Sequence, residues 1–203
     1  MVVASIVGSL VQIAAVLIVG FALFLFTGRK KVSFSNFLGL TRSPLRPVLL
    51  GLAIGASATL ALLAIPGFAT IAKGPGTVPG EALMHGLSQA AIAALVVTAI
   101  FKTAFAEELL FRGVLGKRLI ARLGFRVGNA IQAALFGALH SVLALTPLAT
   151  AAMVAGIVLF SGALGWINGW LNERLGGGSI LPGWACHAAA NLCSYLSLAL
   201  GLL

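Results

Sequence analysis

The sequence contains no aspartate, and its acidic residues number only four, all of them glutamate. The absence of Asp excludes any site that needs a pair of aspartates, including the paired-aspartate type of intramembrane protease. Charged residues of both signs make up 8% of the 203 residues, against about 25% in soluble domains. So few charges cannot cover a soluble globule, and a disordered chain would need the opposite balance of charged and apolar residues.

Cysteine is also scarce, since Cys186 and Cys193 are the only two. They lie seven residues apart in one apolar segment. They therefore share a face of a helix but are too far apart along it for a disulfide. We interpret both as small buried thiols.

Apolar residues are abundant, at 60% of the chain with a mean hydropathy of +1.11. Six apolar stretches approach or reach the length of about 20 helical residues that crosses a bilayer. They are residues 2–26, 48–72, 86–110, 127–146, 149–171 and 179–203. The first is too long for the apolar core of a cleaved signal peptide, so we expect it to be retained. The sequence therefore predicts an all-α polytopic membrane helix bundle of about six transmembrane helices, forming one integral membrane domain over residues 1–203.

Lysine and arginine number 13, and eleven of them fall in alternate loops between the apolar stretches. These loops are residues 27–47, residues 112–126 and the segment around Arg174. Basic residues mark cytoplasmic loops, so we expect these loops in the cytoplasm and both termini outside. The net charge of +9 is therefore explained by basic residues in cytoplasmic loops, and nucleic acid is not expected as a partner.

Three short strings hold most of the ionisable residues within the apolar stretches. They are AEELLFRG with Glu107, Glu108, Phe111 and Arg112, LFGALH with Phe136 and His140, and HAAAN with His187 and Asn191. Each string has residues at i and i+4, which share one face of a helix. Glu108 is therefore expected to pair with Arg112, while Glu107, turned by about 100°, faces another partner. Ionisable groups inside a membrane are costly and mark function by default.

Two kinds of hydrolytic site fit these residues. In one, Glu107 near a histidine is a general base on water, while a second histidine and Asn191 donate hydrogen bonds to an oxyanion. In the other, Glu107, His140 and His187 bind a catalytic zinc ion. Both lead to hydrolysis of a carbonyl compound such as a peptide bond. A purely structural alternative is that the polar residues form hydrogen bonds between helices.

The order EExxFR, FxxxH, HxxxN on successive stretches resembles the CPBP intramembrane protease family. That family includes the type 2 CAAX prenyl endopeptidases and the Abi-type bacteriocin-processing and immunity proteins. The similarity covers about residues 100–195, within a protease-like core of about 86–203. It implies that Glu107 and His140 activate water, that His187 and Asn191 stabilise the oxyanion, and that Glu108 and Arg112 complete the site. It leaves open whether a divalent metal such as zinc takes part, as in a metalloendopeptidase.

Other intramembrane proteases fit less well, because HExxH is absent and residues 159–162 read LFSG where a rhomboid-type site needs GxSG. A proton- or ion-coupled transporter and a non-catalytic immunity or partner protein remain as alternatives. The high Ala, Gly and Leu content suggests the cytoplasmic membrane of a bacterium. The expected partners are the lipid bilayer and a membrane-associated peptide or protein substrate.

Four further polar residues receive structural interpretations. Asn168 and Asn172 are interpreted as packing and interface residues of the fifth stretch. His85 is expected to be solvated in a loop, and Lys102 to extend toward the membrane surface or to pair.

Overall fold

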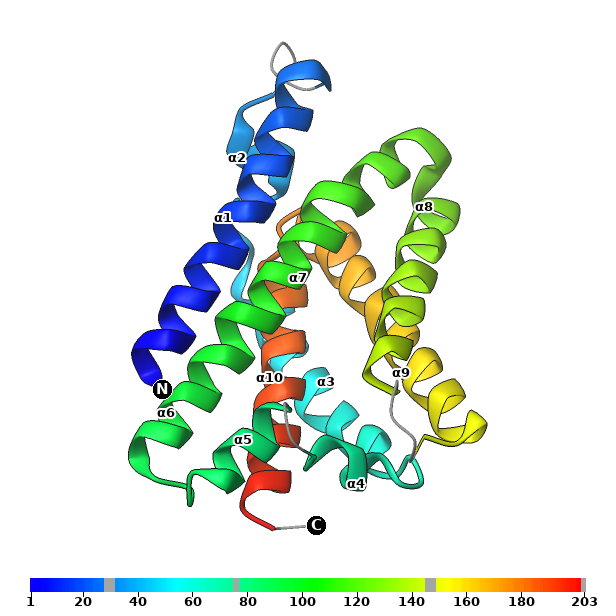
Figure 1. The fold of residues 1–203 in the computed structure, drawn as a ribbon. Helices are drawn as coiled ribbons and strands as arrows, with labels where there is room; N and C mark the ends of the chain where they lie inside the picture. Colours follow the sequence, from blue (N-terminus) through cyan, green and yellow to red (C-terminus); the bar gives the residue numbers. More distant parts are fainter. Residues whose placement is uncertain (28–31, 75–76, 145–148, 202–203) are drawn as a thin grey trace.

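A computed structural model describes residues 1–27, 32–74, 77–144 and 149–201, which form helices and connecting turns without any strand (Figure 1). The prediction of an all-α membrane bundle is confirmed. Figure 1 shows α1 on one side of the bundle and α8 with α9 on the other. The run from α6 to α7 and helix α10 lie between them.

The helices before the central run are α1 (Val2–Thr27), α2 (Phe34–Leu38), α3 (Leu45–Leu63), α4 (Phe68–Ala72) and α5 (Val78–Met84). The central run consists of α6 (Gln89–Val97), the π-helical η1 (Thr98–Phe105), α7 (Ala106–Glu108) and the π-helical η2 (Leu109–Gly116). It continues into α8 (Lys117–His140) and the short 3₁₀ turn η3 (Ser141–Ala144). The remaining elements are α9 (Ala151–Trp170), the π-helical η4 (Leu171–Leu175) and α10 (Leu181–Ala199).

Four helical runs of the described residues are long and apolar enough to cross a membrane. They are Val2–Thr27, Leu45–Leu63, Gln89–His140 and Ala151–Leu175. The predicted stretch 48–72 is wrong at its C-terminal end, because α3 stops at Leu63 and a separate short helix, α4, follows a turn. The last predicted stretch forms α10, which carries more polar residues and is not among the four.

The run of 52 residues includes most of two predicted stretches, 86–110 and 127–146, because α8 reverses direction at Gly124. The φ of 76° and ψ of 165° at Gly124 are not helical, and positive φ is a conformation that glycine adopts without steric cost. The two arms of the resulting hairpin touch, since a Cβ at Gly128 would collide with the backbone of Leu119 and Ile120. Residues 125–140 thus return through the bundle beside α9.

Helix α3 packs against α10 with the two backbones in contact. A Cβ at Gly51 would collide with the carbonyl of Pro182, and one at Gly55 with the carbonyl of Cys186. Thr59, one turn further, donates a hydrogen bond to the carbonyl of Ala190 at 3.2 Å. Small residues spaced four apart allow such close approach of membrane helices.

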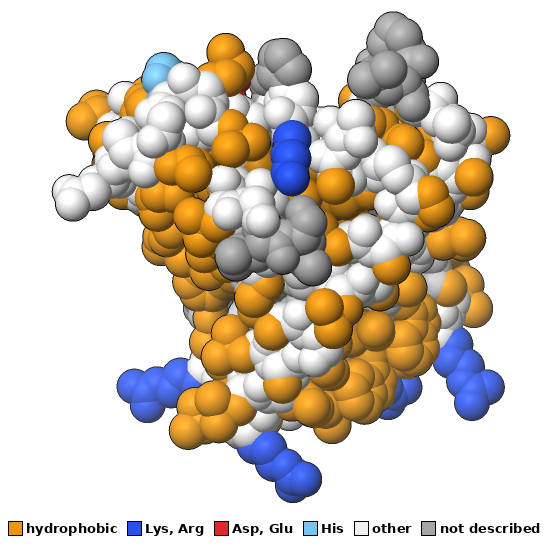
Figure 2. Space-filling view, turned by 90° about the horizontal axis from the view of Figure 1, so that it is seen from below, with side chains coloured by type: hydrophobic (Ala, Val, Ile, Leu, Met, Phe, Trp, Pro, Cys, Tyr) orange, Lys and Arg blue, Asp and Glu red, His pale blue; other side chains and the backbone are white. Residues whose placement is uncertain are grey.

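The three basic loops meet at one end of the bundle. Lys117 forms an ion pair with Glu173 at 2.9 Å and donates to the carbonyl of Gly178. Arg118 donates to the carbonyl of Phe37 at 2.6 Å and stacks on its ring. Figure 2 views the molecule from below the orientation of Figure 1. On this face hydrophobic side chains cover much of the surface, and Lys and Arg project singly. Which side of the membrane this basic end faces stays a prediction.

Candidate active site

Glu107 lies at the centre of the first string, on α7, a short α-helical segment between two π-helical ones. Its Oε2 atom is 4.0 Å from His140 Nε2 and 3.9 Å from His187 Nε2. The two histidines come from α8 and α10, so three helices contribute to one point. The Glu107 side chain is 27% exposed, which leaves it accessible to a small molecule such as water. Segments of π-helix inside α-helices are frequent at functional sites.

Glu108 is fully buried, and a single oxygen of its carboxylate receives three partners. Its Oε1 is 3.0 Å from Arg112 Nη1, 3.1 Å from His187 Nδ1 and 2.9 Å from Asn168 Nδ2. The predicted pair with Arg112 is confirmed, as is the divergence of the two adjacent glutamates. Since burial of an unpaired carboxylate is very costly, these partners explain how the charge is accommodated.

Both histidines are held by their Nδ1 atoms. His140 Nδ1 is 2.8 Å from the carbonyl of Phe136, and His187 Nδ1 is 3.1 Å from the Glu108 carboxylate. A backbone carbonyl and a carboxylate can only accept a hydrogen bond, so each Nδ1 carries a proton. The Nε2 atom of each ring then faces Glu107. A histidine oriented in this way through its second nitrogen is typical of catalytic and ligating imidazoles.

Phe136, the aromatic residue of the second string, packs against several residues of the site. Its buried ring packs on the His140 ring at a centroid distance of 4.4 Å and edge-on to His187 at 5.7 Å. The Arg112 guanidinium lies 4.2 Å from the same ring, and Phe111 contacts it at 4.9 Å. A rigid ring shared by these groups restricts the positions that both imidazoles can take.

Asn191 lies one turn beyond His187 on α10, but its amide hydrogens have protein partners. Its Nδ2 donates to Thr103 Oγ1 at 2.9 Å and makes a longer bond of 3.4 Å to the carbonyl of Ala99. The sequence did not single out Thr103, because a threonine in an apolar helix gives no signal of its own. Thr103 in turn donates to the carbonyl of Ala99.

Asn168 and Asn172 are fully buried on α9 and η4, and the sequence interpretation of them as packing residues is incomplete. Asn168 binds Glu108, as described above, while Asn172 Oδ1 accepts the backbone N–H of Gly183 at 2.7 Å near the start of α10. Their polarity inside an apolar helix was the available signal. Only the fold shows that Asn168 reaches a residue 60 positions earlier in the chain.

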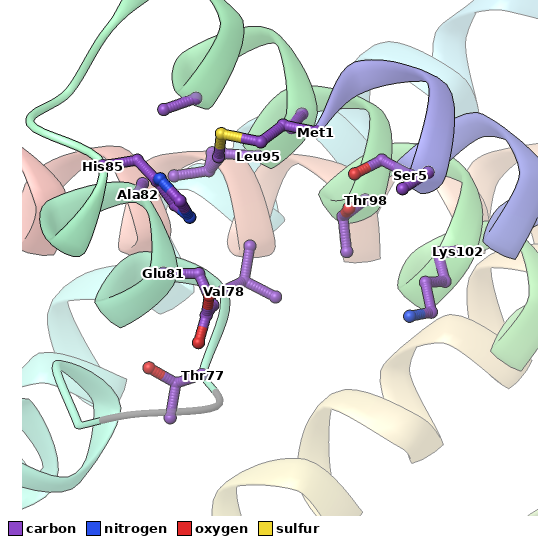
Figure 3. A pocket seen from close by; sticks show the side chains of 13 residues that line it. Met1, Ser5, Thr77, Val78, Glu81, Ala82, His85, Leu95, Thr98 and Lys102 are labelled. Atoms are coloured by element: carbon purple, nitrogen blue, oxygen red, sulfur yellow. The ribbon is translucent and has the colours of Figure 1, made fainter.

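His85 and Lys102 lie away from this site, in a separate open pocket of about 280 Å³ between α1, α5 and the run from α6 to η1 (Figure 3). Glu81 also lines it, and none of the six predicted site residues does. Figure 3 shows Lys102 at the opposite end of the pocket from His85 and Glu81. Each of these three residues thus lies outside the cluster around Glu107.

The donor types of Glu107, His140 and His187 suit zinc, but their arrangement does not. Zinc ligands lie about 2.0–2.2 Å from the ion, so two tetrahedral ligand atoms are about 3.4 Å apart. The separations here are 3.9 and 4.0 Å. Within the described part of the chain, no three His, Cys, Asp or Glu side chains are grouped so that they could hold a metal ion. We therefore derive no catalytic step through a metal.

Comparison with known proteins agrees with the three strings. The family model described as type II CAAX prenyl endopeptidase, Rce1-like, matches residues 88–193. This segment begins just before α6 and ends within α10, so it includes every residue of the site described above. No curated protein and no solved structure matches the chain.

Proposed function

Because the chain belongs to the type II CAAX prenyl endopeptidase (Rce1-like) family, we propose that it hydrolyses a peptide bond in a membrane-associated peptide or protein. The observation that carries this proposal is the position of Glu107 between the Nε2 atoms of His140 and His187. The family supports a CAAX-protease-like endopeptidase. The catalytic roles below are our proposal.

Glu107 is the general base in this proposal. Its distances of 3.9 and 4.0 Å to the two imidazoles are too long for direct hydrogen bonds and are suited to a bridging water. A water in this position donates one hydrogen to the Glu107 carboxylate and the other to the unprotonated Nε2 of His140. As the water attacks the substrate carbonyl carbon, Glu107 takes its proton and later passes it to the leaving amine.

His187 and Asn191 stabilise the oxyanion that forms on the substrate carbonyl. To donate from Nε2, the His187 ring must carry protons on both nitrogens, and the Glu108 carboxylate at Nδ1 offsets that charge. Asn191 contributes the hydrogen of its long 3.4 Å bond to Ala99, which is the weaker of its two bonds. Donors aimed at the developing negative charge lower the barrier most in a site with little water.

Arg112 and Glu108 are the charge-balancing pair of the site. Arg112 is buried against both Glu108 and the Phe136 ring, so it keeps the Glu108 carboxylate ionised and directed at His187. The substrate is a peptide presented at the membrane, because the site lies on helices of the membrane bundle. A bacterial source would make its substrate something other than a prenylated CAAX protein.

The test is cleavage of a peptide library by the purified protein in detergent and in lipid vesicles, with products identified by mass spectrometry. Glu107→Gln should lower cleavage by about 10²–10⁴-fold while the protein remains folded. Glu81→Gln makes the same chemical change in the separate pocket and should cleave as the wild type does. Equal cleavage by wild type and Glu107→Gln would contradict the proposal.

A further inference from the structure

We propose that Asn168 on α9 is a positioning residue that orients Glu108 and, through it, the imidazole of His187. This inference rests on the proposed function, because it concerns how the same site is held. Asn168 belongs to none of the three strings, which lie on α7 with η2, on α8 and on α10. It therefore adds a fourth helix to the site.

Asn168 is one of two hydrogen-bond donors to a Glu108 oxygen that also forms an ion pair with Arg112. Its Nδ2 is 2.9 Å from Glu108 Oε1, the atom that also faces Arg112 at 3.0 Å and His187 at 3.1 Å. Asn168 and Glu108 are both 0% exposed, so their hydrogen bond does not compete with bulk water. The two hydrogen bonds and the neighbouring Arg112 charge restrict the orientation of this carboxylate, and the His187 Nδ1–H follows that orientation.

The remaining contacts of Asn168 argue against a purely structural role. Its other amide atom, Oδ1, is buried without a hydrogen-bond partner among the described residues. An unpaired buried oxygen costs stability, and a leucine of similar size would avoid that cost. The Asn168 side chain thus makes one hydrogen bond, and its acceptor is the Glu108 carboxylate that binds His187.

Asn129 on α8 provides a matched control, because it is a buried asparagine that also binds across helices. It is also 0% exposed, but its Nδ2 donates to the carbonyl of Trp166 at 3.0 Å and its Oδ1 accepts from Gln132 at 2.8 Å. Asn129 therefore joins α8 to α9 and has no hydrogen bond to Glu108. A loss of packing or of a buried amide affects both positions, whereas a loss of Glu108 orientation affects only Asn168.

The experiment compares wild type, Asn168→Leu, Asn168→Ala and Asn129→Leu in cleavage kinetics and thermal unfolding. Removing a residue that orients a ligating or catalytic side chain typically lowers activity about 10–100-fold. We expect both Asn168 variants to lose kcat by that factor with KM within about twofold and with the fold retained. Asn129→Leu should keep kcat within about twofold, even where its unfolding temperature falls further.

A second readout does not depend on a substrate. In spectra of protein labelled with ¹⁵N-histidine, the His187 signal of the wild type should show the proton on Nδ1, and His187→Gln assigns the signal. Both Asn168 variants should shift or broaden this Nδ1–H signal of His187, and Asn129→Leu should not.

Unchanged kcat in a folded Asn168 variant would overturn the inference. So would a loss of kcat that is proportional to the loss of stability, by the same relation, in the Asn168 and Asn129 variants. If the wild type cleaves no peptide, the proposed function fails, and the His187 spectra still decide the positioning role. An unchanged His187 signal in Asn168→Leu and Asn168→Ala would then overturn it.

Discussion

The different environments of Glu107 and Glu108 predict that the same substitution lowers activity at both positions but lowers stability strongly only at Glu108. Glu107→Gln keeps the shape of the side chain and removes its basicity. Glu107 is partly exposed and lies 3.9 Å or more from both imidazoles, so the substitution should change the free energy of unfolding by less than about 1 kcal/mol. Loss of a general base should lower kcat by about 10²–10⁴-fold.

Glu108→Gln leaves the Arg112 guanidinium buried without its ion-pair partner. Breaking a buried pair from one side costs about 3–5 kcal/mol. For a chain of 150–250 residues each kcal/mol moves the unfolding temperature by about 2–4 °C, so we expect a decrease of about 6–20 °C. Activity should fall as well, since the His187 Nδ1–H loses its negatively charged acceptor.

The assay is cleavage of one peptide from the library together with thermal unfolding followed by intrinsic fluorescence, for both variants in the same detergent. Glu81→Gln serves as the control for the loss of one carboxylate. The reasoning is refuted if Glu107→Gln retains near-normal turnover while Glu108→Gln is inactive and as stable as the wild type. The roles of the two glutamates would then be reversed.

Three further predictions concern metal, packing and topology. Because Glu107 lies too far from both imidazoles for a tetrahedral ion, treatment with 1,10-phenanthroline should leave turnover within about twofold; loss of activity restored by added zinc would refute this. Gly55→Ala places a Cβ against the carbonyl of Cys186 and should destabilise by about 1–3 kcal/mol, measured by thermal unfolding. Gly162→Ala, where a Cβ meets only ordinary contacts, should cost less than about 1 kcal/mol, and equal losses would contradict the packing argument. Reporter fusions after residue 203 and within residues 112–126 should place the first outside and the second in the cytoplasm; a cytoplasmic C-terminus would contradict the assigned orientation.

The parts of the site that follow from helical spacing could be predicted from the sequence. Residues four apart share a helix face, so the pairing of Glu108 with Arg112 and the divergence of Glu107 needed no tertiary information. The grouping of Glu107 with His140 and His187 needed three helices to meet at one depth. The family resemblance carried by the three strings implied that meeting, and the separations in the structure agree with it.

The parts that depend on tertiary partners could not be predicted. The bond from Asn168 to Glu108 joins residues 60 apart, and an isolated asparagine in an apolar helix is equally consistent with packing. Asn191 donates hydrogen bonds to Thr103 and to the carbonyl of Ala99, and no rule of sequence spacing predicts these partners. The predicted stretch 48–72 also extended beyond the end of α3 at Leu63. The residues after Leu63 remain apolar, so hydropathy alone does not reveal the turn before Gly67, where φ is 75°.

The backbone contact between α3 and α10 determines how the bundle can admit a peptide. Sliding or separating these helices would break a fit in which Gly51 and Gly55 lie directly on the carbonyls of Pro182 and Cys186. Helix α10 carries two residues of the proposed site, and its contact with α3 therefore keeps it in a fixed position. Helix α3 contains none of the three strings but supports α10 in this way. By contrast, few residues of α1 are buried, so its displacement would disrupt far less packing. A lateral opening wide enough for an extended peptide must therefore form somewhere other than the seam between α3 and α10.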